Sequence, residues 1–186
     1  MANYAATMSS TISAHVRSYE PLTPSDLQRL ADIARSDRED FFQRYPRWSA
    51  LYSRRLLCVA LCQGAALHFV DGKNGVKDFD VWSFFCEIAG QPIRRRRVVS
   101  RDFGQPQFGT SPDKPDFIGR KVDLLLKSIA CTPDSSPIHS LQRYLTEGRT
   151  DTARCLAKKA VVLLEPIEQV GAVVWQPNDN SRSLKS

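Results

Sequence analysis

The chain has 186 residues, of which 42% are hydrophobic and 25% are charged, and its formal net charge is +6. These values are typical of a soluble globular protein, and the length fits a single domain. No apolar stretch is long enough to cross a membrane, and the first residues lack the apolar core of a secretion signal. Because the five cysteines form no C-x-x-C pair, we expect reduced thiols and a cytoplasmic protein.

We predict three regions: a polar, flexible arm over residues 1–20, one domain over residues 21–176, and a disordered polar tail over residues 177–186. Thr23 and Pro24 are typical of a helix start, and the apolar spacing continues to Pro46. Apolar residues recur at helical spacing again over residues 48–62, which predicts a second helix.

A β-hairpin is predicted next. Its strands cover residues 66–70 and 76–85, and its turn covers residues 71–75. Asp-Gly and Asn-Gly dipeptides between apolar runs are typical of hairpin turns. Gly64 and Ala65 would form a small-residue turn just before this hairpin, where a phosphate could approach the backbone.

For the second half of the chain, the sequence predicts a long connection followed by strands and helices. The connection over residues 92–116 is rich in Pro, Gly and Arg, and its start could form a short charged edge strand. A strand covers residues 117–129, helices begin at Ser136 and Thr150, and a last strand covers residues 170–175. Residues 161–164 could begin a strand or extend the helix before them.

Three aspartates suggest a metal site. Asp78 and Asp80 are two apart in a predicted strand, so their carboxylates would lie side by side on one face. Two adjacent like charges are unfavourable unless a cation lies between them, and carboxylate oxygens suit Mg²⁺. Asp123 interrupts an apolar run and is costly to bury without a partner. On a neighbouring strand it would complete a triad.

Over residues 56–127 the order of these elements resembles the nucleotidyltransferase superfamily, the polymerase-beta-like fold. The shared pattern is a glycine turn, then Asp78-Phe79-Asp80-Val81, then Asp123 on a later strand. Two positions depart from the family pattern. Ala65 replaces a Ser or Gly, and Gln63 replaces a hydrophobic residue.

The resemblance implies an α/β (α+β) domain with a small mixed sheet flanked by helices. It also implies transfer of an NMP from an NTP, with Mg²⁺ or Mn²⁺ held by Asp78, Asp80 and Asp123. Backbone N–H groups of Gly64 and Ala65 would contact the triphosphate. A helix lysine, Lys158 or its neighbour Lys159, would also bind phosphate.

The basic residues are concentrated after the hairpin, where Arg94, Arg95, Arg96 and Arg97 are consecutive. Such a run suits an anionic partner such as RNA, or it is a solvated loop. Two other functions remain open. One is a module of the same fold with weak or lost activity that binds nucleotide or nucleic acid. The other is a metal-dependent nuclease, which the absence of an acid-x-lysine pair after Asp80 disfavours. The sequence leaves the oligomeric state, the nucleotide and the acceptor open.

Two further residue types are assigned to the interior. Cys58 and Cys62 are one helical turn apart without accompanying His or Cys residues, so we predict core residues in place of a zinc site. His68 is predicted to be a core or turn histidine and not a catalyst.

Overall fold

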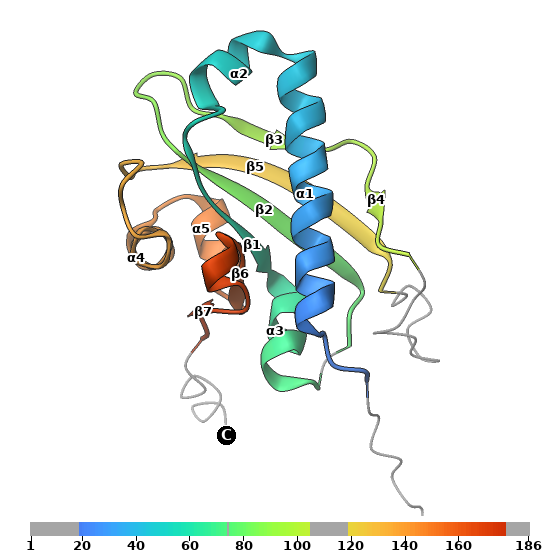
Figure 1. Cartoon of the computed structure of the whole chain (residues 1–186). Helices are drawn as coiled ribbons and strands as arrows, with labels where there is room; N and C mark the ends of the chain where they lie inside the picture. Colours follow the sequence, from blue (N-terminus) through green and yellow to red (C-terminus); the bar gives the residue numbers. More distant parts are fainter. Residues whose placement is uncertain (1–18, 74, 105–118, 178–186) are drawn as a thin grey trace, which may run out of the picture.

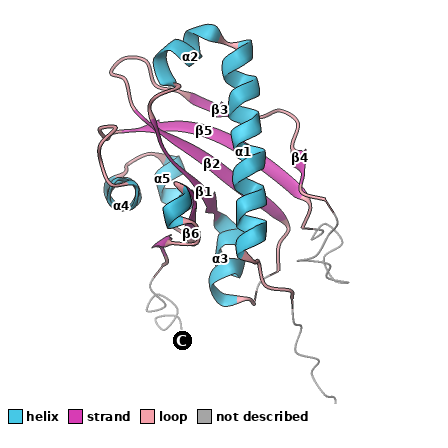
Figure 2. Ribbon diagram, in the orientation of Figure 1, coloured by secondary structure: helices cyan, strands magenta, loops and turns pink. Residues whose placement is uncertain are grey.

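The computed structural model describes residues 19–73, 75–104 and 119–177. These residues form a mixed α/β fold with an open sheet of seven strands and five α-helices (Figures 1 and 2). The predicted arm and tail lie almost wholly outside these ranges. No helix in the described residues is long and apolar enough to cross a membrane.

The sheet has the strand order β3-β5-β2-β1-β6-β7, and β4 pairs with β5 beside β3. The strands are β1 (Leu56–Cys62), β2 (Asp78–Cys86), β3 (Arg94–Arg96), β4 (Arg101–Asp102), β5 (Lys121–Ile129), β6 (Val161–Glu165) and β7 (Val173–Trp175). β2 and β5 run parallel, and the other pairs run antiparallel. The two longest strands are therefore central neighbours, which fixes the residues that face each other between them.

Helices cover both faces of the sheet. They are α1 (Pro24–Arg44), α2 (Pro46–Tyr52), α3 (Gln63–Asp71), α4 (Pro137–Glu147) and α5 (Asp151–Leu156), with a 3-10 turn at Ile167–Gln169. α1 crosses one face (Figure 1), where Leu27 and Leu30 pack with Phe79 and Val81 of β2. The opposite face carries α4 and α5, which pack against residues of β1 and β2 such as Phe84.

Several predicted elements are confirmed. α1 begins at a capping box in which Thr23 and Asp26 each accept a backbone hydrogen bond from the other residue. α4 begins after Ser136, whose hydroxyl accepts from the His139 N–H, and the N-cap of α5 is Thr150. Residues 161–164 form a strand, and the start of the arginine run forms the edge strand β3.

The predicted hairpin is wrong. Residues 56–62, predicted as the end of a helix, form the strand β1, and residues 66–70, predicted as a strand, lie in α3. β1 is a central strand that is buried on both faces, so its sequence is continuously apolar and does not alternate. The glycine expected in the turn, Gly72, instead has φ 66° and caps the C-terminus of α3.

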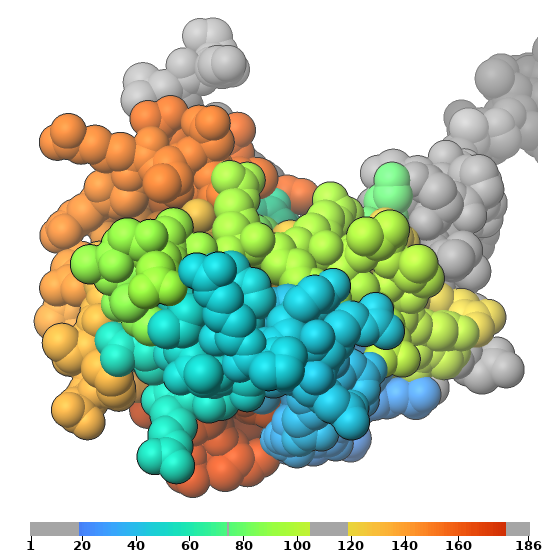
Figure 3. All heavy atoms as spheres, turned by 90° about the horizontal axis from the view of Figure 1, so that it is seen from above, coloured from blue at the N-terminus to red at the C-terminus, as the bar shows by residue number. Residues whose placement is uncertain are grey.

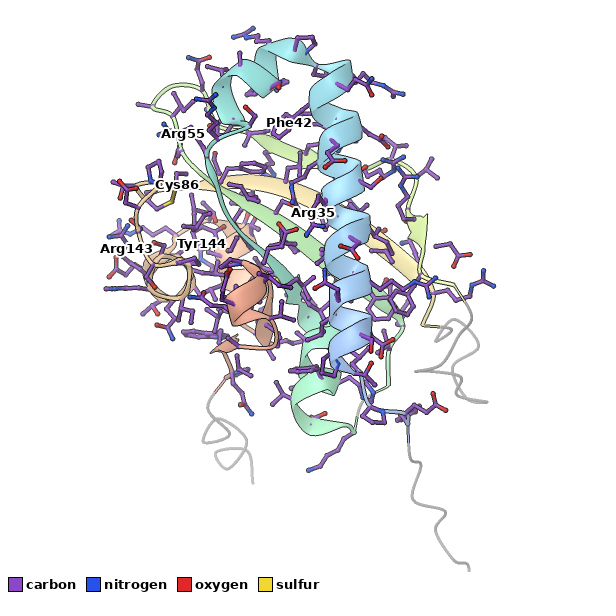
Figure 4. All side chains as sticks on the ribbon, in the orientation of Figure 1. Arg35, Phe42, Arg55, Cys86, Arg143 and Tyr144 are labelled. Carbon is purple, nitrogen blue, oxygen red and sulfur yellow. A yellow bond between two sulfur atoms is a disulfide. The ribbon has the colours of Figure 1, made fainter. Side chains whose placement is uncertain are left out.

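The expectation of five reduced cysteines is also wrong. Cys86 and Cys131 form a disulfide. Cys86 lies at the end of β2 near α4, with its sulfur drawn in yellow in Figure 4. Cys58 and Cys62 are buried core residues, as predicted, and Cys155 is an exposed thiol. His68 is fully buried in α3, as predicted, and its Nε2 lies 2.7 Å from the carbonyl oxygen of Glu20.

α1 is held to the sheet by a buried ion pair. Arg38 donates to a carboxylate oxygen of Glu165 on β6 at 2.7 Å, and Arg35 donates to the other oxygen at 3.0 Å. Arg35 is labelled on α1 in Figure 4. Burial lowers the pKa of Arg38, although the nearby carboxylate of Glu165 acts in the opposite direction. One carboxylate therefore links α1 to β6.

Candidate active site

The sheet brings the three predicted aspartates to one face. Asp80 on β2 is the direct partner of Asp123 on the parallel strand β5, and Asp78 is the partner of Lys121. Since side chains alternate along a strand, Asp78, Asp80 and Asp123 share one face. Phe79, between the first two, is buried in the core on the opposite face. The predicted neighbourhood of the two strands is therefore correct.

Asp123 has three donors in the structure. Its side chain is 4% exposed, and its Oδ2 accepts from Arg96 Nη2 at 2.5 Å and from Lys121 Nζ at 3.0 Å. Its Oδ1 accepts from Ser100 Oγ at 2.5 Å. Burial alone would raise the pKa of Asp123, but the hydrogen bonds from Ser100, Lys121 and Arg96 outweigh it and lower the pKa. Asp123 is thus an anion stabilised by local cations.

Asp80 has the opposite electrostatic environment. Burial raises its pKa to about 6, and the neighbouring carboxylates of Asp78 and Asp123 add to the rise. The positive charges of Arg96 and Lys121 only partly offset these effects. An added cation beside Asp80 would therefore relieve this electrostatic cost.

The donor set fits a hard divalent cation in part. Asp78 and Asp80 supply adjacent carboxylates, which are ligands that Mg²⁺ and Mn²⁺ accept. In the described part of the chain, however, no three His, Cys, Asp or Glu side chains are grouped closely enough to hold a metal. Both oxygens of Asp123 are bonded to Arg96, Lys121 or Ser100. Ligation by Asp123 would therefore require these donors, Arg96 above all, to move away.

The N-terminus of α3 begins beside Asp80. The Cα partner of Asp80 on β1 is Cys62, and α3 starts at the next residue, Gln63. Gln63 has φ 64°, a left-handed conformation that is rare for residues other than Gly, and its Nε2 donates to the Cys155 carbonyl at 2.9 Å. This sharp change of direction joins strand and helix without a loop.

Gly64 and Ala65 lie in the first turn of α3, and not in a separate turn as predicted. The N-cap residue Cys62 makes no side-chain hydrogen bond to this turn. N–H groups in a first helical turn have no partner within the helix, and together with the helix dipole they favour an anion. The side chain of Ala65 is buried in the core, so only its backbone can take part.

The lysine beside this helix start is Lys159, the neighbour of the predicted Lys158. A Cβ built on Gly64 would lie 3.9 Å from Lys159 Nζ. Both lysines are exposed and precede β6, whose first residue, Val161, pairs with Cys62. This pairing brings the segment before β6 to the start of α3. No local sequence signal distinguishes the two lysines, because the choice depends on the path of the chain into β6.

The arginine run is divided between the two faces of the sheet. Arg95 and Arg97 both donate to the carboxylate of Asp37 on α1. Arg96 reaches the opposite face and bonds to Asp123. The alternative of a solvated loop is therefore wrong for Arg95 and Arg97, which are partly buried in ion pairs. Arg94 and Arg96 are exposed, and Arg96 is bonded to Asp123. Strand alternation is the physical reason for the division.

No protein-family model matches this sequence, and comparisons with curated proteins and with solved structures likewise find no match. The resemblance to nucleotidyltransferases is therefore carried by the motif residues alone. The metal, the substrate and the assignment to this fold are accordingly proposals.

Proposed function

We propose that this protein is a metal-dependent nucleotidyltransferase that moves an NMP from an NTP to an acceptor. The observation that carries the proposal is the common location of two complementary groups. Asp78, Asp80 and Asp123 share one sheet face, and the uncapped N-terminus of α3 begins beside Asp80 with Lys159 next to it. Carboxylates for a cation and N–H groups with a lysine for phosphate are what a metal-bound triphosphate requires.

Each residue then has a role. Asp78 and Asp80 would hold Mg²⁺ or Mn²⁺, which when bound neutralises charge on phosphoryl oxygens. Gly64 and Ala65 would donate backbone N–H groups to the triphosphate, and Lys159 would add a positive charge there. Asp123 lies opposite Asp80 and would orient the acceptor hydroxyl from the neighbouring strand. Its lowered pKa favours the role of an anionic ligand over that of a strong base.

A second candidate function is a binding module of the same fold with weak or lost activity. Two ion pairs favour it. Arg96 and Lys121 already neutralise Asp123, so the third carboxylate is satisfied without a metal. Such a module would bind nucleotide or nucleic acid through its basic surface and release no pyrophosphate.

The test is incubation with each labelled NTP and Mg²⁺ or Mn²⁺, with mass analysis of nucleic acid, small molecules and the protein itself. We expect labelled NMP on an acceptor. Asp123→Asn should lower turnover by about 10²-fold or more while NTP affinity stays within a few-fold, the scale of a lost metal ligand or catalytic group.

Asp32→Asn is the matched control, because Asp32 is exposed on α1, which covers the opposite face of the sheet from Asp123, and pairs with Arg35. It should leave turnover unchanged. Binding of NTP with no product from any of the four nucleotides would support the binding module. Equal loss of stability, affinity and turnover in Asp123→Asn would identify a structural aspartate.

A further inference from the structure

A cleft lies between the C-terminal end of α1 and the β3–β4 segment, and Arg96 is the residue that its lining shares with the candidate active site. Its volume is about 610 Å³, within the range of ligand sites. The residues of its lining that matter here are Arg44 and Tyr45 at the end of α1, and Arg95, Arg97, Val98 and Val99 opposite them. Seen from above, the yellow-green β3–β4 segment lies against the cyan end of α1 (Figure 3).

The inner wall of this cleft holds two guanidinium groups in place. Asp37 of α1 is buried, and its Oδ2 accepts from Arg95 Nη1 at 3.2 Å while its Oδ1 accepts from Arg97. Arg95 also lies over the ring of Phe41, 4.7 Å from its centroid. One carboxylate thus fixes two cations and neutralises only one of them. A guanidinium has five N–H donors, so both arginines retain donors for an anion.

The outer rim adds a positive charge and apolar surface. Arg44 is exposed, and among the described residues no carboxylate lies within ion-pair distance of it. Val98 and Val99 are 98% and 71% exposed, and Tyr45 is 46% exposed. Cationic grooves with exposed aromatic and apolar side chains are typical of proteins that bind single-stranded nucleic acid, in which phosphates meet the cations and bases meet the apolar surface.

We infer that this cleft binds the backbone of a single-stranded nucleic acid, and that this strand is the acceptor in the proposed reaction. Arg96 supplies the connection, because it lines the cleft and also bonds to Asp123. A strand bound along Arg44, Arg95 and Arg97 would reach the candidate active site on the opposite face of the sheet by passing around the β3–β4 edge at Arg96. The inference rests on the proposed function for the identity of the acceptor, but the binding itself requires neither metal nor NTP.

The experiment measures binding of a fluorescein-labelled 12-mer of oligouridylate by anisotropy, at several salt concentrations and without metal or NTP. We expect affinity to fall steeply with salt. Arg44→Gln should reduce the slope of log K against log salt by about 0.7, the value for one phosphate contact on a single strand. The double variant Val98→Glu, Val99→Glu should weaken binding about tenfold, because its carboxylates repel phosphates at exposed positions.

The controls make similar charge changes elsewhere. Arg149→Gln removes an exposed arginine that does not line the cleft, and Ile167→Glu adds a carboxylate at a residue that is 61% exposed. Both should bind within about twofold of the native chain, as expected for screened, distant charges. All the substituted residues are exposed, so circular dichroism should show unchanged folding.

Three results would overturn the inference: salt-independent or absent binding, equal binding by the cleft and control variants, or stronger binding of an oligoglutamate peptide than of the oligouridylate. The last result would mean that the cleft takes an acidic protein segment. Asp80→Asn separates this inference from the proposed function. It should bind the oligouridylate normally and lose Mn²⁺-dependent NTP binding, so each proposal can fail without the other.

Discussion

Arg96 Nη2 lies 2.5 Å from Asp123 Oδ2, although the Arg96 side chain is 63% exposed and the Asp123 side chain is 4% exposed. A surface cation therefore neutralises a buried carboxylate at the centre of the candidate metal site. The same oxygen also accepts from Lys121. Removal of Arg96 would leave Lys121 and Ser100 as donors to Asp123, and would lower the positive charge that competes with a divalent cation at this face.

The first prediction follows from this contact. Arg96→Gln should raise the affinity for Mn²⁺ about 3- to 10-fold, because one competing positive charge is lost at a partly solvated position. Titration calorimetry measures the change. Arg94→Gln is the control, since Arg94 lies on the same strand and face but is not bonded to Asp123. Lower affinity in Arg96→Gln would show that the arginine supports the site.

The second prediction concerns the raised pKa of Asp80. Because burial raises this pKa to about 6 from 3.8, the folded chain binds this proton more tightly than the unfolded chain. The contribution of Asp80 to the free energy of unfolding therefore falls as pH rises through this window. Asp80→Asn should be more stable than the native chain by about 2 to 3 kcal/mol at neutral pH, with the difference vanishing below about pH 4.

Urea denaturation across this pH range measures the effect. Addition of Mn²⁺ at neutral pH should stabilise the native chain and leave Asp80→Asn unchanged, because the variant lacks the charge that binds the cation. A variant less stable than the native chain at neutral pH would mean that the Asp80 carboxylate has a stabilising partner in solution.

The third prediction distinguishes the two adjacent lysines. Lys159→Met should weaken binding of Mn²⁺–NTP and of free pyrophosphate about tenfold, because a charge-assisted contact to phosphate is lost. Lys158→Met changes the same charge one residue away and should have an effect within about twofold. Equilibrium dialysis with labelled ligands measures both. If Lys158→Met has the larger effect, the position of Lys159 beside Gly64 does not reflect phosphate binding.

The fourth prediction concerns Asp37, which holds two arginines of the edge strand. Asp37→Asn should destabilise the protein by about 2 to 4 kcal/mol, since it removes the shared partner of two partly buried guanidinium groups. Asp40→Asn, which breaks the exposed pair with Arg101, should cost less than about 1 kcal/mol. Thermal and urea unfolding compare the two variants. Equal losses of unfolding free energy in the two variants would show that the buried ion pairs of Asp37 stabilise the protein no more than the exposed pair of Asp40.

The sequence is sufficient to predict the two long strands that carry the aspartates. β2 begins with alternating polar and apolar residues, β5 contains an apolar run, and both patterns are typical of strands in a sheet. The capped helices α1 and α4 were predicted for a similar reason. The exchange of helix and strand around Cys62 cannot be predicted from the sequence, because a seven-residue apolar run fits a buried strand or a helix equally well. The position of α3 can be predicted only once β1 is known to be a central strand of the sheet.

The ion pairs of the candidate site could not be predicted from sequence. The cations nearest to Asp123 in the sequence are Arg120 and Lys121. In the structure Asp123 pairs with Lys121 and with Arg96, while Arg120 bonds to Asp102. Arg96 is 27 residues from Asp123 in the chain, and only the pairing of β3 with β5 brings the two together. The Cys86–Cys131 disulfide has the same origin, since it joins residues 45 positions apart.

The four identical residues of the arginine run have a consequence for how β3 is aligned. Shifting β3 by one residue would place an arginine opposite each partner again, so the arginines cannot specify their own register. Ile93 specifies it, because its side chain is 2% exposed and its backbone exchanges hydrogen bonds with Ser128 on β5. A single apolar side chain thus determines which arginines meet Asp37 and which one reaches Asp123.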